Sequence, residues 1–442
     1  MNITPRFNIH NINDFENNGQ VRNLIIIVRA DPIICGHSTE ARNLAEAAKD
    51  AGYENVHIVS YPLDVLEKSS LPLKPLDSIQ PYTRGIQVDR PNPIGGYKVL
   101  DGRLSYAISG HIVDLLHRFS GKTAIMDLYL VPHGQMALNA VQSFEQTGVF
   151  KDIVTIAEAV GSDITNVVKN AVHENRFGAA QLVLSNYLQH DIPVAVSEYT
   201  KELILEAGNQ VDAALGTNFE RRLAEKVGIS YPAINTIDYT SLDERSEEID
   251  AVLEKRGLDR DEYVLFLSRI APAKGVDDLI HAYKASDLYQ KKKLVICGTG
   301  PALESMKELA GADDSIIFYN DISDKEKGPL MNACYTYALP SKPHPEFVET
   351  FGIAIAEKML AGGLGVVVTT RTGGIPEATG GNCLEHEAGD VEGLTQQLNV
   401  VSVMSESERA ELASRAQNFA LRFDKGQVLA NLTRLTMAQE AA

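Results

Sequence analysis

A repeated alternation of short apolar runs with helical segments limits the folds that this chain can adopt. In the first half, five such runs are expected to be strands: residues 24–28, 56–61, 124–130, 153–156 and 194–197. The runs are largely continuous rather than alternating, which is typical of parallel strands covered on both faces. Residues 38–51 carry apolar side chains at helical spacing and end at Gly52. This half therefore predicts a doubly wound α/β sheet.

A second series of the same kind begins near Tyr263. Strands are expected at 264–267, 294–297, 316–319, 336–339 and 365–368, with helices at 277–285, 302–309 and 352–360. Ser323 and Glu326 match the capping-box pattern, so another helix should begin there. Three further helices are expected at 391–403, 406–419 and 425–438. The β–α alternation again predicts a parallel sheet.

Two segments interrupt these series. Residues 62–102 are rich in Pro, Gly, Asp and Tyr, and we expect a long loop or small insertion that serves a site. Residues 238–262 are polar and acidic, with apolar positions for one helix, which indicates a domain boundary. A chain of 442 residues is also too long for one ordinary core.

The charge balance excludes several classes of partner. The net charge is −18, which argues against nucleic acid and against an anionic membrane surface. The N-terminal residues 1–18 are polar and do not resemble a signal peptide, and no run of about 18 apolar residues occurs. The four cysteines are dispersed, without metal-ligand or disulfide spacing. We therefore expect a cytoplasmic protein.

The second half carries two groups of residues suited to an anionic ligand. Arg269 and Lys274 flank a turn between a strand and a helix, where a diphosphate would meet two cations and a helix N-terminus. Glu349 follows strand 336–339, and Glu357 lies on the next helix. A carboxylate such as Glu349 can hold sugar hydroxyls. The alternatives are a surface turn with ordinary basic residues and an exposed helix charge at Glu357.

These elements resemble, in order and spacing, one large family. The Arg269–Lys274 turn, the E-x7-E element from Glu349 to Glu357, and the turn at 373–377 are similar to those of retaining GT-B glycosyltransferases, which include sucrose-phosphate synthases and many mannosyl- and glucosyltransferases. The resemblance covers the C-terminal half and is looser before it. It implies two Rossmann-like domains facing a central cleft, 1–240 and 241–415, with a helix at 416–442 returning to the first.

On the donor side the resemblance implies a role for each matching residue. Arg269 and Lys274 would bind the diphosphate and stabilise the leaving group, and Glu357 would bind the ribose. Glu349 would hold hydroxyls of the donor sugar. The remaining donor contacts, mostly through backbone, would come from Gly298, Gly300, Ile322, Thr350, Phe351, Gly352 and Ile353. The family often has Pro where this chain has Thr350.

In the first half the match is carried by fewer residues. Of the glycine pair that the family usually has, only Gly36 is present here. His37 and Ser38 would add side-chain contacts to the donor and the acceptor. Alternatively, Ser38 caps the helix. His133 matches a histidine that approaches the donor sugar, with a structural role as the alternative. Glu158 stands where the family often carries another histidine, and would meet an amine or hydroxyl of the acceptor.

The implied reaction is transfer of a hexose from a nucleotide diphosphate sugar to a hydroxyl, with retention and without metal or other cofactor. Residues 1–238 carry 20 Lys and Arg against 27 Asp and Glu, which favours a small soluble acceptor: a sugar, sugar phosphate, polyol or natural-product core. A GT-B phosphorylase, a nucleotide-sugar epimerase and a non-catalytic nucleotide-sugar-binding protein are the alternatives. A dehydrogenase would need a G-x-G-x-x-G after the first strand, which is absent. The base, the sugar, the acceptor and any homo-oligomer stay open.

Overall fold

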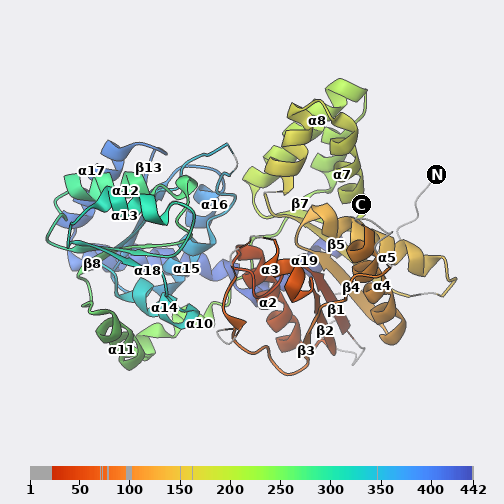
Figure 1. The fold of residues 1–442 in the computed structure, drawn as a ribbon, viewed down its shortest axis with the longest axis horizontal. Coiled ribbons are helices and arrows are strands. Elements are labelled where there is room, and N and C mark those ends of the chain that lie inside the picture. Colours follow the sequence, from red (N-terminus) through yellow and green to blue (C-terminus); the bar gives the residue numbers. More distant parts are fainter. Residues whose placement is uncertain are drawn as a thin grey trace. The chain divides into compact units, whose positions relative to one another are not determined.

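The computed structural model describes residues 22–69, 71, 73–76, 79–95, 102–149, 151–161, 163–345 and 347–440. It divides into two compact units: Met1–Ala233 with Lys425–Ala442, and Ile234–Asp424 (Figure 1). The polar N-terminal segment and the motif residues Ser162 and Glu346 lie outside the described residues. Each unit contains one parallel sheet with helices around it, as the alternation of strands and helices predicts.

The sheet of the first unit has seven parallel strands in the order β3-β2-β1-β4-β5-β6-β7. Their bounds are β1 (Arg22–Ile27), β2 (Asn55–Val59), β3 (Ile86–Asp89), β4 (Lys122–Asp127), β5 (Ile153–Ala159), β6 (Ile192–Ala195) and β7 (Gly228–Ile229). The strand order reverses between β1 and β4, which pair from Arg22↔Lys122 to Ile27↔Asp127. In open parallel sheets, ligands bind beyond the carboxyl ends of the strands at such a switch point.

Nine α-helices of the first unit are described. They are α2 (Gly36–Asp50), α3 (Leu63–Glu67), α4 (Gly102–Arg118), α5 (Gln135–Glu145), α6 (Lys169–His173), α7 (Phe177–Gln189), α8 (Glu198–Leu215), α9 (Phe219–Lys226) and α19 (Lys425–Glu440). Wider helical turns at Leu130–Gly134 and Asp163–Val168 follow β4 and β5.

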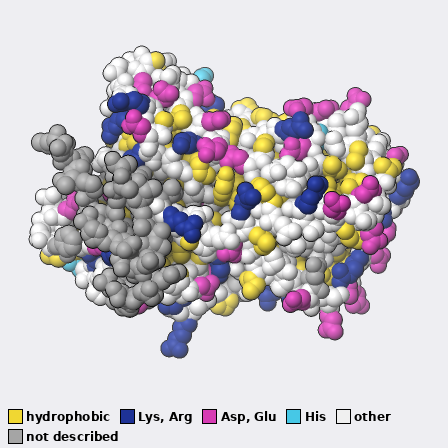
Figure 2. All heavy atoms as spheres, turned by 180° about the vertical axis from the view of Figure 1, so that it is seen from behind, with side chains coloured by type: hydrophobic (Ala, Val, Ile, Leu, Met, Phe, Trp, Pro, Cys, Tyr) yellow, Lys and Arg dark blue, Asp and Glu magenta, His cyan; other side chains and the backbone are white. Residues whose placement is uncertain are grey.

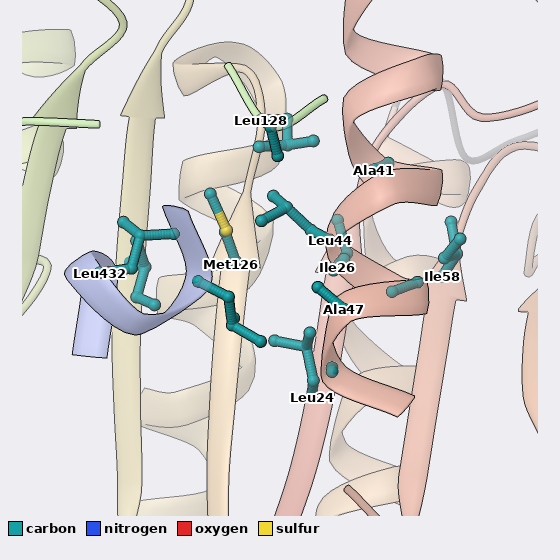
Figure 3. Packing of buried hydrophobic residues seen from close by; sticks show 14 of the residues in the cluster. Leu24, Ile26, Ala41, Leu44, Ala47, Ile58, Met126, Leu128 and Leu432 are labelled. Atoms are coloured by element: carbon teal, nitrogen blue, oxygen red, sulfur yellow. The ribbon is translucent and has the colours of Figure 1, made fainter. Parts of the chain in front are cut away.

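A core of aliphatic side chains fixes α2 and α19 on this sheet. Leu24 and Ile26 of β1 and Met126 of β4 pack with Leu44 of α2, and all are at most 2% exposed. Figure 3 shows Leu432, from the far end of the chain, in the same cluster. Burying a side chain of this size contributes about 1.5–3 kcal/mol, so the last helix is held to the first unit by apolar contact.

The second unit has six parallel strands in the order β10-β9-β8-β11-β12-β13. Their bounds are β8 (Tyr263–Leu267), β9 (Lys293–Cys297), β10 (Ile316–Tyr319), β11 (Thr336–Leu339), β12 (Val366–Thr370) and β13 (Leu384–His386). The helices are α10 (Ile237–Thr240), α11 (Ser246–Arg256), α12 (Val276–Ala285), α13 (Leu303–Ala310), α14 (Asp324–Ala333), α15 (Ile353–Ala361), α16 (Ile375–Thr379), α17 (Val391–Val403) and α18 (Glu406–Ala420). The order reverses between β8 and β11, which makes this junction the switch point of the second sheet.

Most sequence predictions of elements are confirmed, and the errors have physical reasons. The strands expected at 316–319 and 336–339 coincide with β10 and β11, and the capping box of Ser323 and Glu326 is present. The expected loop at 62–102 is wrong in part, because it contains α3 and the edge strand β3. Every residue of the edge strand β3 is at least partly exposed, so the strand does not require a continuous apolar run. The run 124–130 is a strand only to Asp127, and the helical turn before α5 begins at Leu130.

Two features of the described residues bear on membranes and nucleic acids: whether a helix could cross a membrane, and whether basic side chains cluster on the surface. Among the described residues no helix is both long and apolar enough to cross a membrane. Figure 2 shows Lys and Arg side chains scattered among Asp and Glu on that face.

Candidate functional site

The turn after β8 presents two cations in contrasting environments. Arg269 is exposed, whereas Lys274 is only 8% exposed and ends a short 3₁₀ turn. Gly275 follows with φ +66°, and a Cβ there would lie 2.0 Å from the Pro340 carbonyl oxygen. Only glycine permits this approach, so it seats the Lys274 turn against the end of β11.

The turn after β9 supports the Arg269 turn through backbone contact. A Cβ on Gly298 or Gly300 would lie 2.0 or 2.2 Å from the carbonyl oxygens of Ser268 and Ile270 respectively. The Ile270 amide also donates to the Thr299 carbonyl at 2.8 Å. These two glycines, expected near the nucleotide, therefore hold the backbone on both sides of Arg269.

The loop after β11 brings Glu349 to Lys274. Their side chains form an ion pair and are only 12% and 11% exposed. The ring of Phe347 lies beside both cations, 4.9 Å from Lys274 Nζ and 6.0 Å from the Arg269 guanidinium carbon. Phe347 was not expected in the site, because a single aromatic residue in a polar loop carries no motif.

Two further glycines fix the backbone of Glu349. The Gly374 amide donates to the Glu349 carbonyl at 2.9 Å. A Cβ on Gly373 or Gly374 would lie 1.9 Å from the carbonyl oxygen of Glu349 or Thr350. The glycines of the turn at 373–377 thus have a structural role: they pack against the backbone of the loop that carries Glu349 and Thr350.

Helix α15 begins directly beyond this loop. Gly352 is its N-cap with φ +102°, and the first intrahelical hydrogen bond runs from the Ile355 amide to the Gly352 carbonyl at 2.9 Å. Amides before that bond, such as that of Ile353, precede the helical ladder and can face an anion. Phe351 is buried, and its ring meets Phe423 edge-to-face at 4.9 Å, which anchors the helix start.

Glu357 on α15 lies in a network that the sequence did not indicate. Tyr239 of α10 hydrogen-bonds the Glu357 carboxylate, and burial together with that carboxylate raises the pKa of Tyr239 well above its usual value. The pKa of Lys327 is raised above its usual value. Burial acts to lower this pKa, but the carboxylates of Glu357 and Asp324 raise it by more. Tyr239 was missed because it lies in the segment expected to be a domain boundary. Ile322 is half-buried between β10 and α14.

In the first unit, the predicted loop residues lie at the start of α2. Gly36 and half-buried His37 begin the helix. The alternative that Ser38 caps α2 is wrong: the cap is Cys35, whose sulfur accepts from the Ser38 amide at 3.4 Å. The Ser38 hydroxyl is buried and meets no hydrogen-bond partner among the described residues.

His133 sits in an aromatic cluster at the carboxyl ends of β1, β2 and β4. Its Nε2 lies 3.1 Å from the Tyr61 hydroxyl, and Tyr129 stands edge-on between His133 and His37, with both ring centroids 6.1 Å away. The Arg29 guanidinium carbon lies 5.0 Å from the Tyr129 ring centroid. This cluster occupies the switch point of the first sheet.

Burial keeps these histidines neutral. Desolvation, assisted by Arg29, lowers the pKa of His133 from 6.5 to about 3 and that of His37 to about 4. A neutral imidazole can donate from one nitrogen and accept at the other, which suits a hydroxyl ligand. Arg29 itself was missed, because one basic residue after a strand is common.

Glu158 belongs to a group of buried carboxyls rather than to an open surface. It is fully buried on β5, and burial together with Glu40 and Asp127 raises its pKa well above the usual value. The Ser230 hydroxyl lies beside it and opposes that shift. Glu40 of α2 accepts from the Ala233 amide at 3.2 Å, and burial raises its pKa to about 8.

The structure therefore gathers the predicted residues into two groups, each at the switch point of its own sheet. Arg269, Lys274, Glu349 and the start of α15 surround the ends of β8 and β11, whereas His37 and His133 lie near the ends of β1 and β4. Within the described ranges, no three His, Cys, Asp or Glu side chains are placed to hold a metal ion.

One comparison with known proteins falls within the second unit. Residues 248–416 match the family model of glycosyl transferases group 1. The GDP-mannose-dependent α-(1-6)-phosphatidylinositol monomannoside mannosyltransferase of Mycolicibacterium smegmatis is 26% identical over 212 residues. That match covers 46% of this chain and 55% of the relative, so the chain spans about half of the relative's length.

Solved structures match over nearly the whole chain. HepE of Anabaena, crystallised with UDP and glucose, has a TM-score of 0.64 at 17% identity and covers 95% of this chain and 99% of its own. Sucrose-phosphate synthase of Thermosynechococcus elongatus has a TM-score of 0.63 at 16% identity, covering 96% and 100%. At such identities the likeness establishes the fold, and the expected GT-B class of two Rossmann-like sheets is confirmed. The family match and the mannosyltransferase relative support a glycosyltransferase.

Proposed function

We propose, from the match of residues 248–416 to glycosyl transferases group 1, that the chain transfers a hexose from a nucleotide diphosphate sugar to an acceptor hydroxyl with retention. The observation that carries the proposal is the buried ion pair of Lys274 and Glu349, beside exposed Arg269 and the start of α15. This arrangement supports the proposal, because cations can stabilise a departing diphosphate and a carboxylate can accept hydrogen bonds from sugar hydroxyls.

Each donor group has a defined task in this proposal. Arg269 and Lys274 bind the diphosphate and stabilise the negative charge that develops on the leaving oxygen. Glu349 accepts hydrogen bonds from the sugar hydroxyls, and Glu357 binds the ribose. The first amides of α15 add a fixed dipole toward the phosphates and the sugar.

The first unit would supply neutral contacts for the sugar and the acceptor. His133 is held by Tyr61 with its Nδ1 free of any described partner, so that nitrogen can meet a sugar hydroxyl. Gly36 and His37 at the start of α2 can approach the donor. The two cations supply the charge that a metal ion would otherwise bring, and we therefore propose a metal-independent reaction by front-face attack.

The acceptor is proposed to be small and soluble, as the acidic balance of the first unit favours. Glu158 and Ser38, both buried, are the proposed acceptor contacts. A cytoplasmic location is part of the same proposal.

A binding experiment tests the donor class first. The purified chain is titrated by thermal shift with UDP, GDP, ADP and their glucose and mannose conjugates, with EDTA and then with magnesium. Saturation at 100 times Kd should add about 2.7 kcal/mol of stability. A shift with one base in EDTA supports the proposal and names the donor. No shift with any nucleotide under either condition would overturn it.

A second experiment tests the stereochemistry. The nucleotide sugar identified by binding is incubated with a panel of sugars, sugar phosphates and polyols, and the anomeric configuration of the product is read by NMR. Product with the donor's own configuration supports a retaining transferase. Inversion would contradict the proposed route.

A further inference from the structure

The two cations of the candidate donor site are not equally available. Arg269 is exposed, and among the described residues its only close partner is the Phe347 ring. Lys274 is buried, lies beside the same ring and is ion-paired with Glu349. A phosphate can therefore reach Arg269 directly, whereas Lys274 must first exchange its carboxylate partner.

The loop that carries Glu349 is clamped onto the Lys274 turn. The Lys342 amide donates to the Ala273 carbonyl at 2.9 Å, and Lys342 Nζ lies 2.8 and 2.9 Å from carboxylate oxygens of Asp277 and Asp278. These contacts hold the beginning of the loop on the turn that bears Lys274.

The far side of the loop is equally fixed. His344 and Phe347 exchange two backbone hydrogen bonds, at 2.9 and 3.0 Å, and Gly374 holds the Glu349 carbonyl. The Phe347 ring is thereby held against the ion pair and limits its hydration. Removing one partner of an ion pair shielded in this way leaves a charge that is expensive to keep buried.

We propose that the Lys274–Glu349 pair makes the site select the intact nucleotide sugar over the bare nucleoside diphosphate. A bare diphosphate that engages Lys274 leaves the Glu349 carboxylate unpaired beside phosphate charge. A nucleotide sugar brings hydroxyls that donate to Glu349, so both partners of the broken pair are satisfied at once. This inference rests on the proposed function and deepens it.

The same exchange acts after transfer. Once the hexose has left, Glu349 loses its hydroxyl donors, and re-forming the pair with Lys274 opposes retention of the nucleoside diphosphate. The Lys274–Glu349 pair thus favours both the binding of the nucleotide sugar and the release of the nucleoside diphosphate. Phe347 is a positioning residue for this pair.

The test compares Glu349→Gln with the wild type by isothermal titration calorimetry. The ligands are the nucleoside diphosphate that the wild type binds, chosen from UDP, GDP and ADP, and its glucose or mannose conjugate, without acceptor. In the variant Lys274 has no carboxylate to leave, so the bare diphosphate should bind about tenfold more tightly, a change of 1.4 kcal/mol. The nucleotide sugar should bind more weakly. Weaker or unchanged binding of the bare diphosphate would overturn the inference.

A double variant keeps the test decisive if the single variant folds poorly. Lys274→Met with Glu349→Gln removes both charges, which leaves no unpaired buried charge. It should bind the bare diphosphate within about threefold of the wild type while losing the preference for the nucleotide sugar; an equal loss for both ligands would contradict the inference. Asp277→Asn, which affects the clamp but leaves Asp278, is the matched control and should retain the wild-type preference. Failure of the wild type to bind any nucleotide would count against the proposed function instead.

Discussion

The two groups of candidate residues are built on the same topological feature by opposite electrostatic means. At the switch point of the second unit, charged side chains are paired or exposed: Lys274 with Glu349, and Arg269 toward solvent. At the switch point of the first unit, burial holds His37 and His133 neutral and raises the pKa of Glu40 to about 8. In the proposed function, one group would act through charge and the other through neutral hydrogen-bonding groups.

This difference has a chemical consequence. A group that stabilises a departing diphosphate needs positive charge at the moment of reaction. A group that recognises hydroxyls needs donors and acceptors whose direction is fixed and whose charge does not attract competing ions. The first should therefore respond to loss of charge, and the second to loss of single hydrogen bonds and, through Glu40, to pH.

The largest effect is expected from removing charge in the second unit. Lys274→Ala or Glu349→Ala should lower turnover by about 100-fold or more, as for other lost transition-state contacts. Steady-state rates with the donor identified by binding provide the measurement. Lys307→Ala, which removes an exposed lysine paired with Glu304 on α13, is the control and should behave as the wild type. Wild-type turnover in both site variants would contradict the view that the second unit acts through charge and the first through neutral groups.

A backbone change should disturb the same group without altering charge. In Gly374→Ala the new Cβ would lie 1.9 Å from the Thr350 carbonyl oxygen, so the loop that carries Glu349 must move. We expect a loss of about 1–3 kcal/mol of stability, as for overpacked sites, together with reduced turnover. Thermal unfolding and kinetics measure the two effects. Gly178→Ala, where a Cβ has open space, should do neither. An unaffected Gly374→Ala would show that this turn does not position Glu349.

A pH experiment sharpens the comparison from the side of the first unit. The folded pKa of Glu40, about 8, lies above its usual 4.5, so its contribution to stability is complete below pH 4.5 and is lost as pH rises toward 8. Glu40→Gln does not titrate and can keep the hydrogen bond from Ala233. Its stability relative to the wild type should therefore increase by on the order of 1–3 kcal/mol between pH 5 and 8.

Urea unfolding at both pH values checks this expectation. Parallel pH profiles for Glu40→Gln and the wild type would show that Glu40 is not held protonated by burial.

The smallest effect is expected at His133. Tyr61→Phe removes the hydroxyl 3.1 Å from His133 Nε2 and should reduce stability by about 1 kcal/mol and turnover a few-fold. Because the pKa of His133 is about 3, the ring is neutral at pH 5.5 and above, and the effect on turnover should be the same from pH 5.5 to 8. Rates measured across that range test it. An effect that grows at pH 5.5 would mean that His133 is protonated there.

Much of the fold could be predicted from local patterns, because buried parallel strands require continuous apolar runs. Strands β10 and β11 and the capping box of Ser323 and Glu326 follow directly from such patterns. The edge strand β3 and the short strands β7 and β13 could not be predicted, because they depend on a neighbouring strand rather than on their own composition.

The candidate site shows the same limit. Arg269, Lys274 and Glu349 could be proposed as site residues from the sequence, because their order and spacing resemble a family pattern. Phe347 and Tyr239 were not, because each is significant only through a neighbour distant in sequence: the Lys274 turn for Phe347 and Glu357 for Tyr239.

The two parallel sheets and the residue types at their carboxyl ends could thus be inferred from the amino-acid sequence, since apolar periodicity and turn chemistry are local properties. Which of those residues are charged, paired or neutral depends on the folded structure. The pairing of Lys274 with Glu349 and the neutrality of His133 arise from burial and from partners supplied by other strands and loops. Burial and electrostatic environment are properties of the assembled fold, because they depend on every group within a few ångströms and not on position in the chain.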